Sequence, residues 1–75
     1  MDFSFDKVAN ALYIKISCGK VEESDEISPG IVVDYSPSGD IVGVEILEFS
    51  SRNYDLNTLI TLNEDEIFPA VVKCA

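Results

Sequence analysis

Hydrophobic and polar residues alternate along the first two-thirds of the chain. The run ALYIKIS (residues 11–17) places Leu12, Ile14 and Ile16 at one parity and mostly polar residues at the other. Successive side chains of a strand point to opposite faces, so this run predicts a half-buried β-strand. The run DFSF before it alternates in the same way. Asp6 and Asn10 bracket the intervening residues and suit a hairpin loop.

Three further strands are expected before residue 50. The runs IVVDY (31–35) and IVGVEILEF (41–49) alternate with period two and are rich in β-branched residues. The run KVEESDEI (20–27) is less regular, because Glu23 and Asp25 share the parity of its apolar residues. It is expected at a sheet edge, bulged, or partly facing solvent. Turn signals recur about every eight to ten residues, which predicts an antiparallel β-meander of four to five strands.

The pattern changes in the last third of the chain. Leu56, Leu59 and Ile60 recur at helical spacing, which predicts a short helix in the interval 53–62. Pro69 is expected to stop whatever precedes it, and AVVKCA (70–75) is either a last edge strand or a tail that pairs with another chain. We therefore expect one α+β domain over residues 1–75, with the meander in 1–50, the helix and a C-terminal extension in 51–75, and the helix packed on one sheet face.

The stretch DYSPSGDIVGVE (34–45) has two interpretations. Its spacing is that of a calcium loop, which needs oxygen ligands at positions 1, 3, 5 and 12 and glycine at 6. The matching residues are Asp34, Ser36, Ser38, Gly39 and Glu45. However, hydroxyls replace carboxylates at two ligand positions, and a strand with a rise of ~3.3 Å per residue carries Glu45 away from Ser36 and Ser38. A hairpin turn with Pro37 at its second position and a left-handed Gly39 explains the stretch better.

Charge and composition exclude several classes of function. The 75 residues include 14 Asp and Glu against 5 Lys and Arg, for a net charge of −9. This charge repels nucleic acid and anionic membranes, and it fits solubility or a basic protein partner. The start MDFSFDK lacks the features of a secretory signal, and no run approaches the ~18 apolar residues of a membrane span, so a cytoplasmic protein is expected. Cys18 and Cys74 are expected as reduced thiols, with a disulfide between them as the less favoured alternative.

Catalytic chemistry is restricted because the chain has no histidine. Nucleophile–histidine arrangements are therefore absent, and Cys18 is interpreted as a small filler residue and not as a nucleophile. Asp34 and Glu45 could face each other across the hairpin as an acid–base pair, although structural or solvated carboxylates are favoured. No catalytic residue, metal ligand or cofactor is assigned.

Two segments, FDKVANALYIKIS and GIVVDYSPSGDIVGVEILEFS, resemble the bacterial and archaeal domain-of-unknown-function family 2283 over residues 3–50. Its members carry a pattern like Tyr-Asp-x-x-x-Asp-Ala-Leu-Tyr-Ile, then a strand with Gly and Asp, a turn, and Gly-Ile-Glu-Ile-Leu. The matching positions are Phe5, Asp6, Asn10, Ala11, Leu12, Tyr13, Ile14, Gly30, Asp34, Gly39, Gly43, Val44, Glu45, Ile46 and Leu47. Phe5 and Asn10 depart from the usual Tyr and acid. The resemblance implies a helix-capped β-meander without an established activity. Some members occur beside small toxin-like genes, which implies an antitoxin or immunity role.

These observations favour a non-enzymatic protein-interaction domain. A chain of this size has a small core, and its sheet edges would gain from pairing, so a homodimer is expected. The acidic runs EESDE (22–26) and NEDE (63–66) could face a basic protein partner. The alternative is a small enzyme or divalent-metal-binding protein that uses Asp34 and Glu45. The candidate surface for either role comprises Asp34, Glu45, Tyr13 and Asp6.

Overall fold

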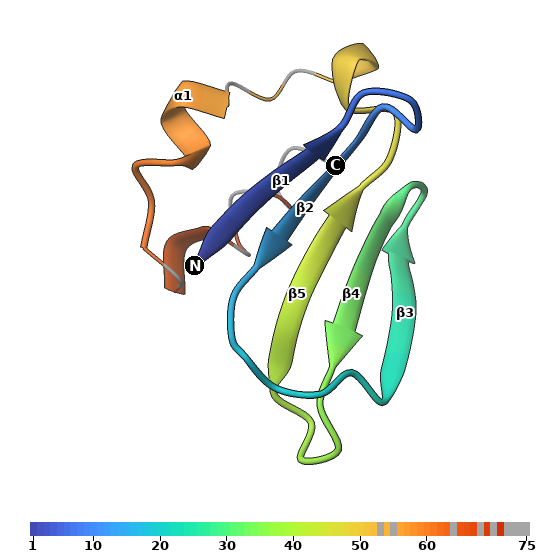
Figure 1. The fold of residues 1–75 in the computed structure, drawn as a ribbon, viewed down its shortest axis with the longest axis vertical. Coiled ribbons are helices and arrows are strands. Elements are labelled where there is room, and N and C mark those ends of the chain that lie inside the picture. The colour runs from blue at the N-terminus through green and yellow to red at the C-terminus, as the bar shows by residue number, and fades with distance from the viewer. Residues whose placement is uncertain (53, 55, 64, 68, 70, 72–75) are drawn as a thin grey trace.

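A single antiparallel sheet forms most of the structure (Figure 1). The computed structural model describes residues 1–52, 54, 56–63, 65–67, 69 and 71. The elements are β1 (Asp2–Asp6), β2 (Ala11–Lys15), β3 (Glu23–Ser28), β4 (Ile31–Tyr35), β5 (Ile41–Ile46), the 3-10 helix η1 (Phe49–Ser51) and α1 (Leu56–Leu59). The predicted antiparallel, β-rich fold is confirmed, and helical structure among the described residues is limited to short segments.

The order of the strands, β1-β2-β5-β4-β3, differs from the predicted meander. A meander would place β3 in the middle of the sheet, yet the sequence of β3, ESDEIS, is the most polar of the five, and its first four residues are exposed. The observed order puts β3 at an edge, with a bulge between Glu26 and Ser28. Of the alternatives predicted for this segment, the edge position is confirmed, and the apolar strands β2, β5 and β4 occupy the centre.

The connection between β2 and β3 makes this order possible. It runs past the ends of β5 and β4 before β3 begins (Figure 1). The backbone N–H groups of Ile16 and Ser17 both donate to the carbonyl oxygen of Val42, and the N–H of Glu22 donates to that of Tyr35. Gly19 lies so close to β5 that a Cβ there would be 3.3 Å from Val42 Cγ2. The connection is therefore fastened to the sheet along its length.

Both predicted hairpin turns are confirmed. In the β1–β2 turn, Asp6 Oδ1 accepts the N–H groups of Val8 and Ala9, at 2.9 and 3.1 Å, and Asn10 has a φ of 53°. In the β4–β5 turn, the N–H of Gly39 donates to the carbonyl oxygen of Ser36 at 2.9 Å, and Gly39 has a φ of 88°. This is a three-residue hairpin loop that ends in a left-handed glycine.

The side chains of the β4–β5 turn bond to one another. The hydroxyls of Ser36 and Ser38 lie 2.9 Å apart, and Ser38 donates to Asp40 Oδ2 at 3.0 Å. The two hydroxyls that matched a calcium loop by spacing therefore belong to the turn, as the hairpin interpretation predicts.

The hydrophobic core lies on one face of the sheet. Its buried members are Leu12, Ile14, Ile31, Val33, Val44, Ile46, Leu59, Ile67 and Val71. The strand residues in this list occupy alternate positions of their strands, as period two predicts for one buried face. Leu59, Ile67 and Val71 come from the last third of the chain, so this part of the chain contributes directly to the core.

The C-terminal third differs from its prediction. The helix α1 lies within the expected interval but ends at Leu59, and Ile60 is 53 % exposed. Residues 65–67, 69 and 71 are also helical, so the expectation that Pro69 stops the preceding structure is wrong. Glu66 Oε1 accepts the N–H of Asn63 at 2.9 Å, as in a capping box. Within AVVKCA, Val71 is helical and buried, and not part of an edge strand, whereas residues 70 and 72–75, with Cys74, lie outside the described residues.

Candidate functional site

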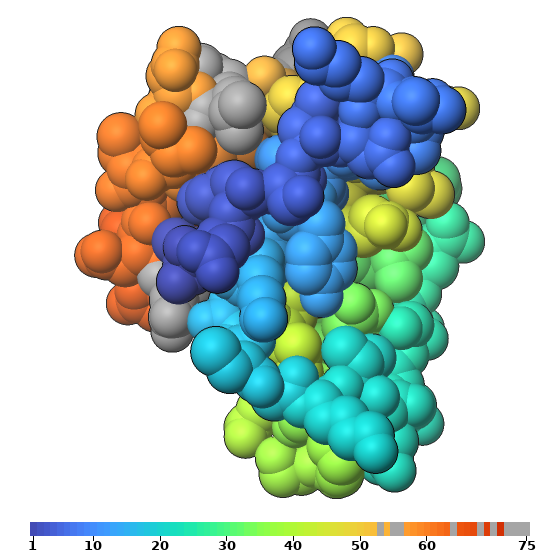
Figure 2. Space-filling model, viewed as in Figure 1, coloured from blue at the N-terminus to red at the C-terminus, as the bar shows by residue number. Residues whose placement is uncertain are grey.

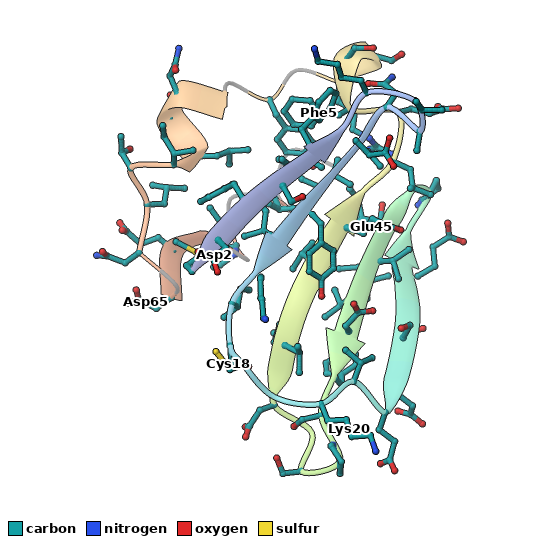
Figure 3. All side chains as sticks on the ribbon, viewed as in Figure 1. Asp2, Phe5, Cys18, Lys20, Glu45 and Asp65 are labelled. Atoms are coloured by element: carbon teal, nitrogen blue, oxygen red, sulfur yellow. The ribbon has the colours of Figure 1, made fainter. Side chains whose placement is uncertain are left out.

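Ten residues form two rows across the face of the sheet that points away from the core. The first row is Ser4, Tyr13, Glu45, Val32 and Glu26, and the second is Asp2, Lys15, Gly43, Asp34 and Ser24. Neighbours in each row are directly opposite on adjacent strands. We call these residues the outer face; Glu45 lies near its middle in Figure 3. Carboxylates dominate the outer face, and Lys15 is its one cationic residue.

A hydrogen-bonded cluster joins three strands of the outer face. The hydroxyl of Tyr13 in β2 donates to Asp34 Oδ2 in β4 at 2.9 Å. The hydroxyl of Ser24 in β3 donates to the other oxygen, Oδ1, at 2.6 Å. Asp34 is half-buried, and a carboxylate in that position is stabilised when both of its oxygens accept hydrogen bonds. The cluster therefore ties the polar edge strand β3 to the centre of the sheet.

Gly43 makes the Tyr13–Asp34 contact possible. It lies in β5, between Lys15 of β2 and Asp34 of β4. A Cβ at Gly43 would collide with the Tyr13 hydroxyl and ring. The tyrosine ring thus lies over the bare backbone of β5, and any side chain at this position would displace it.

The environment of Tyr13 fixes its protonation state. Desolvation by burial, the hydrogen bond to Asp34 and the negative charges of Asp34 and Glu45 together raise the pKa of Tyr13 to about 12. All of these effects disfavour the phenolate. At neutral pH Tyr13 is therefore protonated and donates its hydrogen bond to Asp34.

Asp34 and Glu45 share the outer face, but they are not directly opposite each other. The register places Asp34 opposite Gly43 and Glu45 opposite Val32, so the two carboxylates are diagonal neighbours. Glu45 lies opposite Tyr13 on its other side. Within the described part of the chain, no three His, Cys, Asp or Glu side chains gather closely enough to hold a metal ion. No buried side-chain nitrogen or oxygen among those residues lacks a hydrogen-bond partner.

Of the four candidate residues from the sequence, three come together. Tyr13, Asp34 and Glu45 are neighbours, whereas the carboxylate of Asp6 is engaged with the backbone of the β1–β2 turn. The sequence interpretation missed Ser24 and Gly43. A glycine inside an alternating strand is a known signal of close approach by another group, so Gly43 was detectable in principle. Ser24 had no such signal, because its contact depends on the order of the strands.

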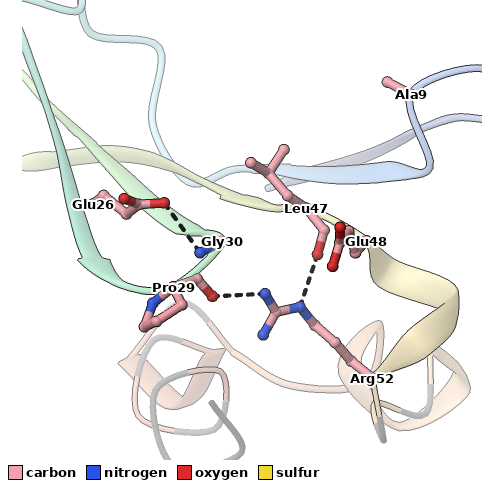
Figure 4. A pocket seen from close by; sticks show the side chains of 7 residues that line it. All are labelled: Ala9, Glu26, Pro29, Gly30, Leu47, Glu48 and Arg52. Carbon is pink, nitrogen blue, oxygen red and sulfur yellow. Dashed lines mark hydrogen bonds between the residues drawn. The ribbon is translucent and has the colours of Figure 1, made fainter.

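An open pocket of about 480 Å³ lies at the end of the sheet beside η1 (Figure 4). Its lining residues are Ala9, Glu26, Pro29, Gly30, Leu47, Glu48 and Arg52. Arg52 donates from Nε to the carbonyl oxygen of Leu47 and from Nη2 to that of Pro29, each at 2.7 Å. These bonds join the β3–β4 turn to the segment after β5, so the guanidinium is a structural brace.

Gly30 is required beside this brace. It has a φ of 78°, and a Cβ there would collide with the guanidinium of Arg52. Its N–H donates to Glu26 Oε2 at 3.1 Å. Glu26 belongs to both the pocket and the outer face, so the two features are continuous.

No helix among the described residues is long and apolar enough to cross a membrane. Comparison with curated proteins and with solved structures finds no match. A family model does match, over residues 2–50, which contain all five strands, both rows of the outer face and the Tyr13–Asp34–Ser24 cluster. The chain therefore belongs to the family described as "Protein of unknown function (DUF2283)".

Proposed function

We propose that this protein is an interaction domain whose outer face binds a basic segment of a protein partner. The observation that carries the proposal is the charge of a sheet face that the remainder of the described chain leaves open. Asp2, Glu26, Asp34 and Glu45 lie on this face with a single lysine. Figure 2 shows residues 56–63, in orange, beside the face and not over it.

The proposal takes the helical segments as the cover of the opposite face. Burial of Leu59, Ile67 and Val71 in the core supports this division of the sheet into a covered and an open side. One side would then maintain the fold while the other stays available for a partner. Small two-layer domains with an antiparallel sheet commonly leave one sheet face in solvent.

Electrostatics and packing favour a basic partner. A net charge of −9 speeds encounter with a basic partner and opposes binding to an acidic one. Tyr13 and Val32 are half-buried in the first row and supply apolar contact area between the carboxylates. Because aromatic residues are over-represented among the residues that dominate binding energy, Tyr13 is the expected anchor.

The finer version of the proposal is an antitoxin-like role. In that role, the outer face would occupy a basic functional surface of a small toxin-like protein and block it. The acidic character of the face and the occurrence of some family members beside toxin-like genes support this version. Identification of a toxin-like protein as the partner would support the antitoxin-like role, and identification of any other protein would remove it.

Charge reversal tests the proposal. In affinity purification from the native cell followed by mass spectrometry, we expect the wild-type chain to retain a basic protein at low NaCl and to lose it at high NaCl. The double variant Glu26→Lys/Glu45→Lys, on the outer face, should lose this protein even at low salt.

A matched control lies on the same edge strand. Glu23 and Asp25 are exposed residues of β3 at the opposite parity, and Glu23→Lys/Asp25→Lys changes the net charge equally. This control should keep the partner. Equal loss in both double variants would show that only overall charge matters, and retention in both would remove the outer face from the proposal.

A second candidate is a small enzyme or metal-binding protein that uses Asp34 and Glu45. The raised pKa of Tyr13 beside these carboxylates favours it, because perturbed ionisable groups concentrate at functional sites. The melting temperature in the presence of calcium, magnesium or manganese distinguishes the two candidate functions. The interaction proposal expects no change in melting temperature with any of them. A rise that Asp34→Asn abolishes would favour the metal site instead.

A further inference from the structure

The two edges of the sheet have opposite characters. At the β3 edge, Glu23 and Asp25 are exposed, and the register with β4 shifts between Glu26 and Ser28, as at a bulge. Charges and bulges at an edge prevent pairing with another chain. At the β1 edge, Phe5 is 45 % exposed and Met1 is 41 % exposed. Among the described residues, β1 pairs on one side only and contains an exposed apolar side chain, Phe5, whereas the one apolar residue within β3, Ile27, is half-buried.

The sequence of β1 reads the same in both directions. It is Asp-Phe-Ser-Phe-Asp, with Ser4 at its centre. In an antiparallel pair of identical strands, a two-fold axis relates the copies. An axis through Ser4 gives every residue of β1 a chemically identical or equivalent partner, because the strand is a palindrome. The palindrome pairs aromatic residues with aromatic residues and acidic residues with acidic residues.

We propose that two copies of the chain pair antiparallel along β1, about a two-fold axis at Ser4, and form one continuous ten-stranded sheet. This register places Phe3 opposite Phe5 of the second copy on the core face. An axis perpendicular to the sheet keeps each residue on its own face, so all phenylalanines stay on one side. The main-chain N–H and C=O groups along the β1 edges of the two copies then pair with each other.

The aromatic residues near this edge support the register. Phe5 already packs edge-to-face against Phe49, with ring centroids 5.8 Å apart. Phe49 in turn stacks on Tyr54, with centroids 6.0 Å apart. Phe3 is half-buried against the core. In the dimer, Phe3 of the second copy would extend this aromatic cluster and cover the exposed part of Phe5, which cross-strand aromatic pairing favours.

The same register creates one opposing interaction. It places Asp2 opposite Asp6 of the second copy on the outer face, and like charges in opposite positions destabilise a strand pair. Lys15, directly opposite Asp2 within the chain, offsets part of this repulsion. Dimerisation should therefore strengthen when salt screens the carboxylates or when Asp2→Asn removes one charge.

Analytical ultracentrifugation at micromolar concentration tests the dimer. We expect a species of twice the 8.2 kDa chain mass, with a dissociation constant that falls as NaCl rises. Phe5→Asp should give only the monomer. Val21→Asp is the matched control near the other edge, because Val21 is 43 % exposed, and it should remain dimeric. A wild-type chain found only at 8.2 kDa, or a Phe5→Asp variant that stays dimeric, would overturn the proposal.

A cross-linking experiment tests the same dimer without the Phe5→Asp variant, which is useful if that variant does not fold. In a Cys18→Ser/Cys74→Ser background, a short bismaleimide should join two copies through Ser4→Cys, which lies on the axis. Ser24→Cys on the β3 edge should not cross-link. Reversed or equal yields would contradict the β1 register. Neither measurement uses a basic partner, so the dimer and the proposed interaction function can fail separately.

Discussion

The absence of a side chain at Gly43 determines the chemistry of the outer face. It lets the Tyr13 ring cross β5 and reach Asp34, and a Cβ would prevent this approach. The glycine, the tyrosine and the aspartate therefore act as one unit. Such a unit should show strong energetic coupling between its members.

Gly43→Ala tests this coupling. Because the methyl group would occupy space filled by the Tyr13 side chain, we expect a loss of about 1–3 kcal/mol in the free energy of unfolding. The same change in a Tyr13→Ala background should cost much less, since the colliding ring is gone. Urea denaturation of the four proteins in this cycle measures the difference. Additive losses would show that Tyr13 does not lie over Gly43.

Tyr13 should also be visible in a pH titration. Its folded pKa of about 12 lies above the ordinary value of 10.0, so folding favours the protonated phenol. The resulting stabilisation is complete below about pH 10 and is lost as pH rises from about 10 to about 12, because the unfolded chain then releases its proton first.

The measurement for this prediction is absorbance of tyrosinate combined with chemical denaturation. Tyr13→Phe should remove one late-titrating tyrosine from the wild-type titration curve. The loss of stability between about pH 10 and about pH 12 should also be shallower in Tyr13→Phe. Identical titration curves for the two proteins would contradict the placement of Tyr13 beside Asp34.

Much of the candidate site could be predicted at the scale of single residues. Parity places Tyr13, Asp34 and Glu45 on the same side of their strands, and the structure agrees. Parity cannot show which strands are neighbours. The contact of Ser24 with Asp34 arises because β3 pairs with β4 at an edge, which depends on packing of the whole sheet.

At the scale of elements, local patterns predicted the strands and turns but not the order of the strands. Alternation and turn chemistry are properties of neighbouring residues, so they locate β1, β2, β4 and β5. The order depends on competition for the buried centre of the sheet. Because β3 is polar, it gains least from burial and lies at the edge beside β4. The connection from residue 16 to 22 leads the chain from β2 past β5 and β4 to that edge.

Arg52 links two of these elements and should contribute to stability. Its bonds to the carbonyl oxygens of Pro29 and Leu47 are made by a charged donor, so Arg52→Met should cost about 1.5–3 kcal/mol. Arg52→Lys should recover only part of this, because one ammonium group cannot reproduce the planar fork. Urea denaturation measures this loss in the free energy of unfolding, provided that the m-value is the same in the variants and the wild-type protein.

Lys20→Met provides the control for this brace. Lys20 is exposed in the connection before β3, and the substitution removes the same formal charge. We expect almost no change in the free energy of unfolding. A loss equal to that of Arg52→Met would assign the effect to net charge and would contradict the structural brace.

At the scale of the whole molecule, the core combines residues of the sheet with Ile67 and Val71 from the last part of the chain. Ile67 and Val71 are four positions apart on helical backbone, and both are completely buried. Their burial offsets the unfavourable presence of Pro69 within the same segment. Helix-breaking propensity predicted a stop there because it considers the local chain alone, whereas tertiary packing decides the outcome.

The net charge of −9 should limit the stability of this small fold. Compaction brings the excess carboxylates together, and salt screens their repulsion over about 10 Å at 0.1 M. We therefore expect the melting temperature to rise between low and high NaCl. A gain of about 1 kcal/mol corresponds to roughly 4–8 °C for a chain of this size.

Glu23→Lys/Asp25→Lys separates this charge effect from dimerisation. Both residues are exposed and remote from β1, and their reversal lowers the excess of negative charge. The salt dependence of the melting temperature should become weaker in this variant. Its dependence on protein concentration, which reports the dimer, should remain. A melting temperature that falls as NaCl rises would mean that attractive pairs outweigh repulsion in the folded chain.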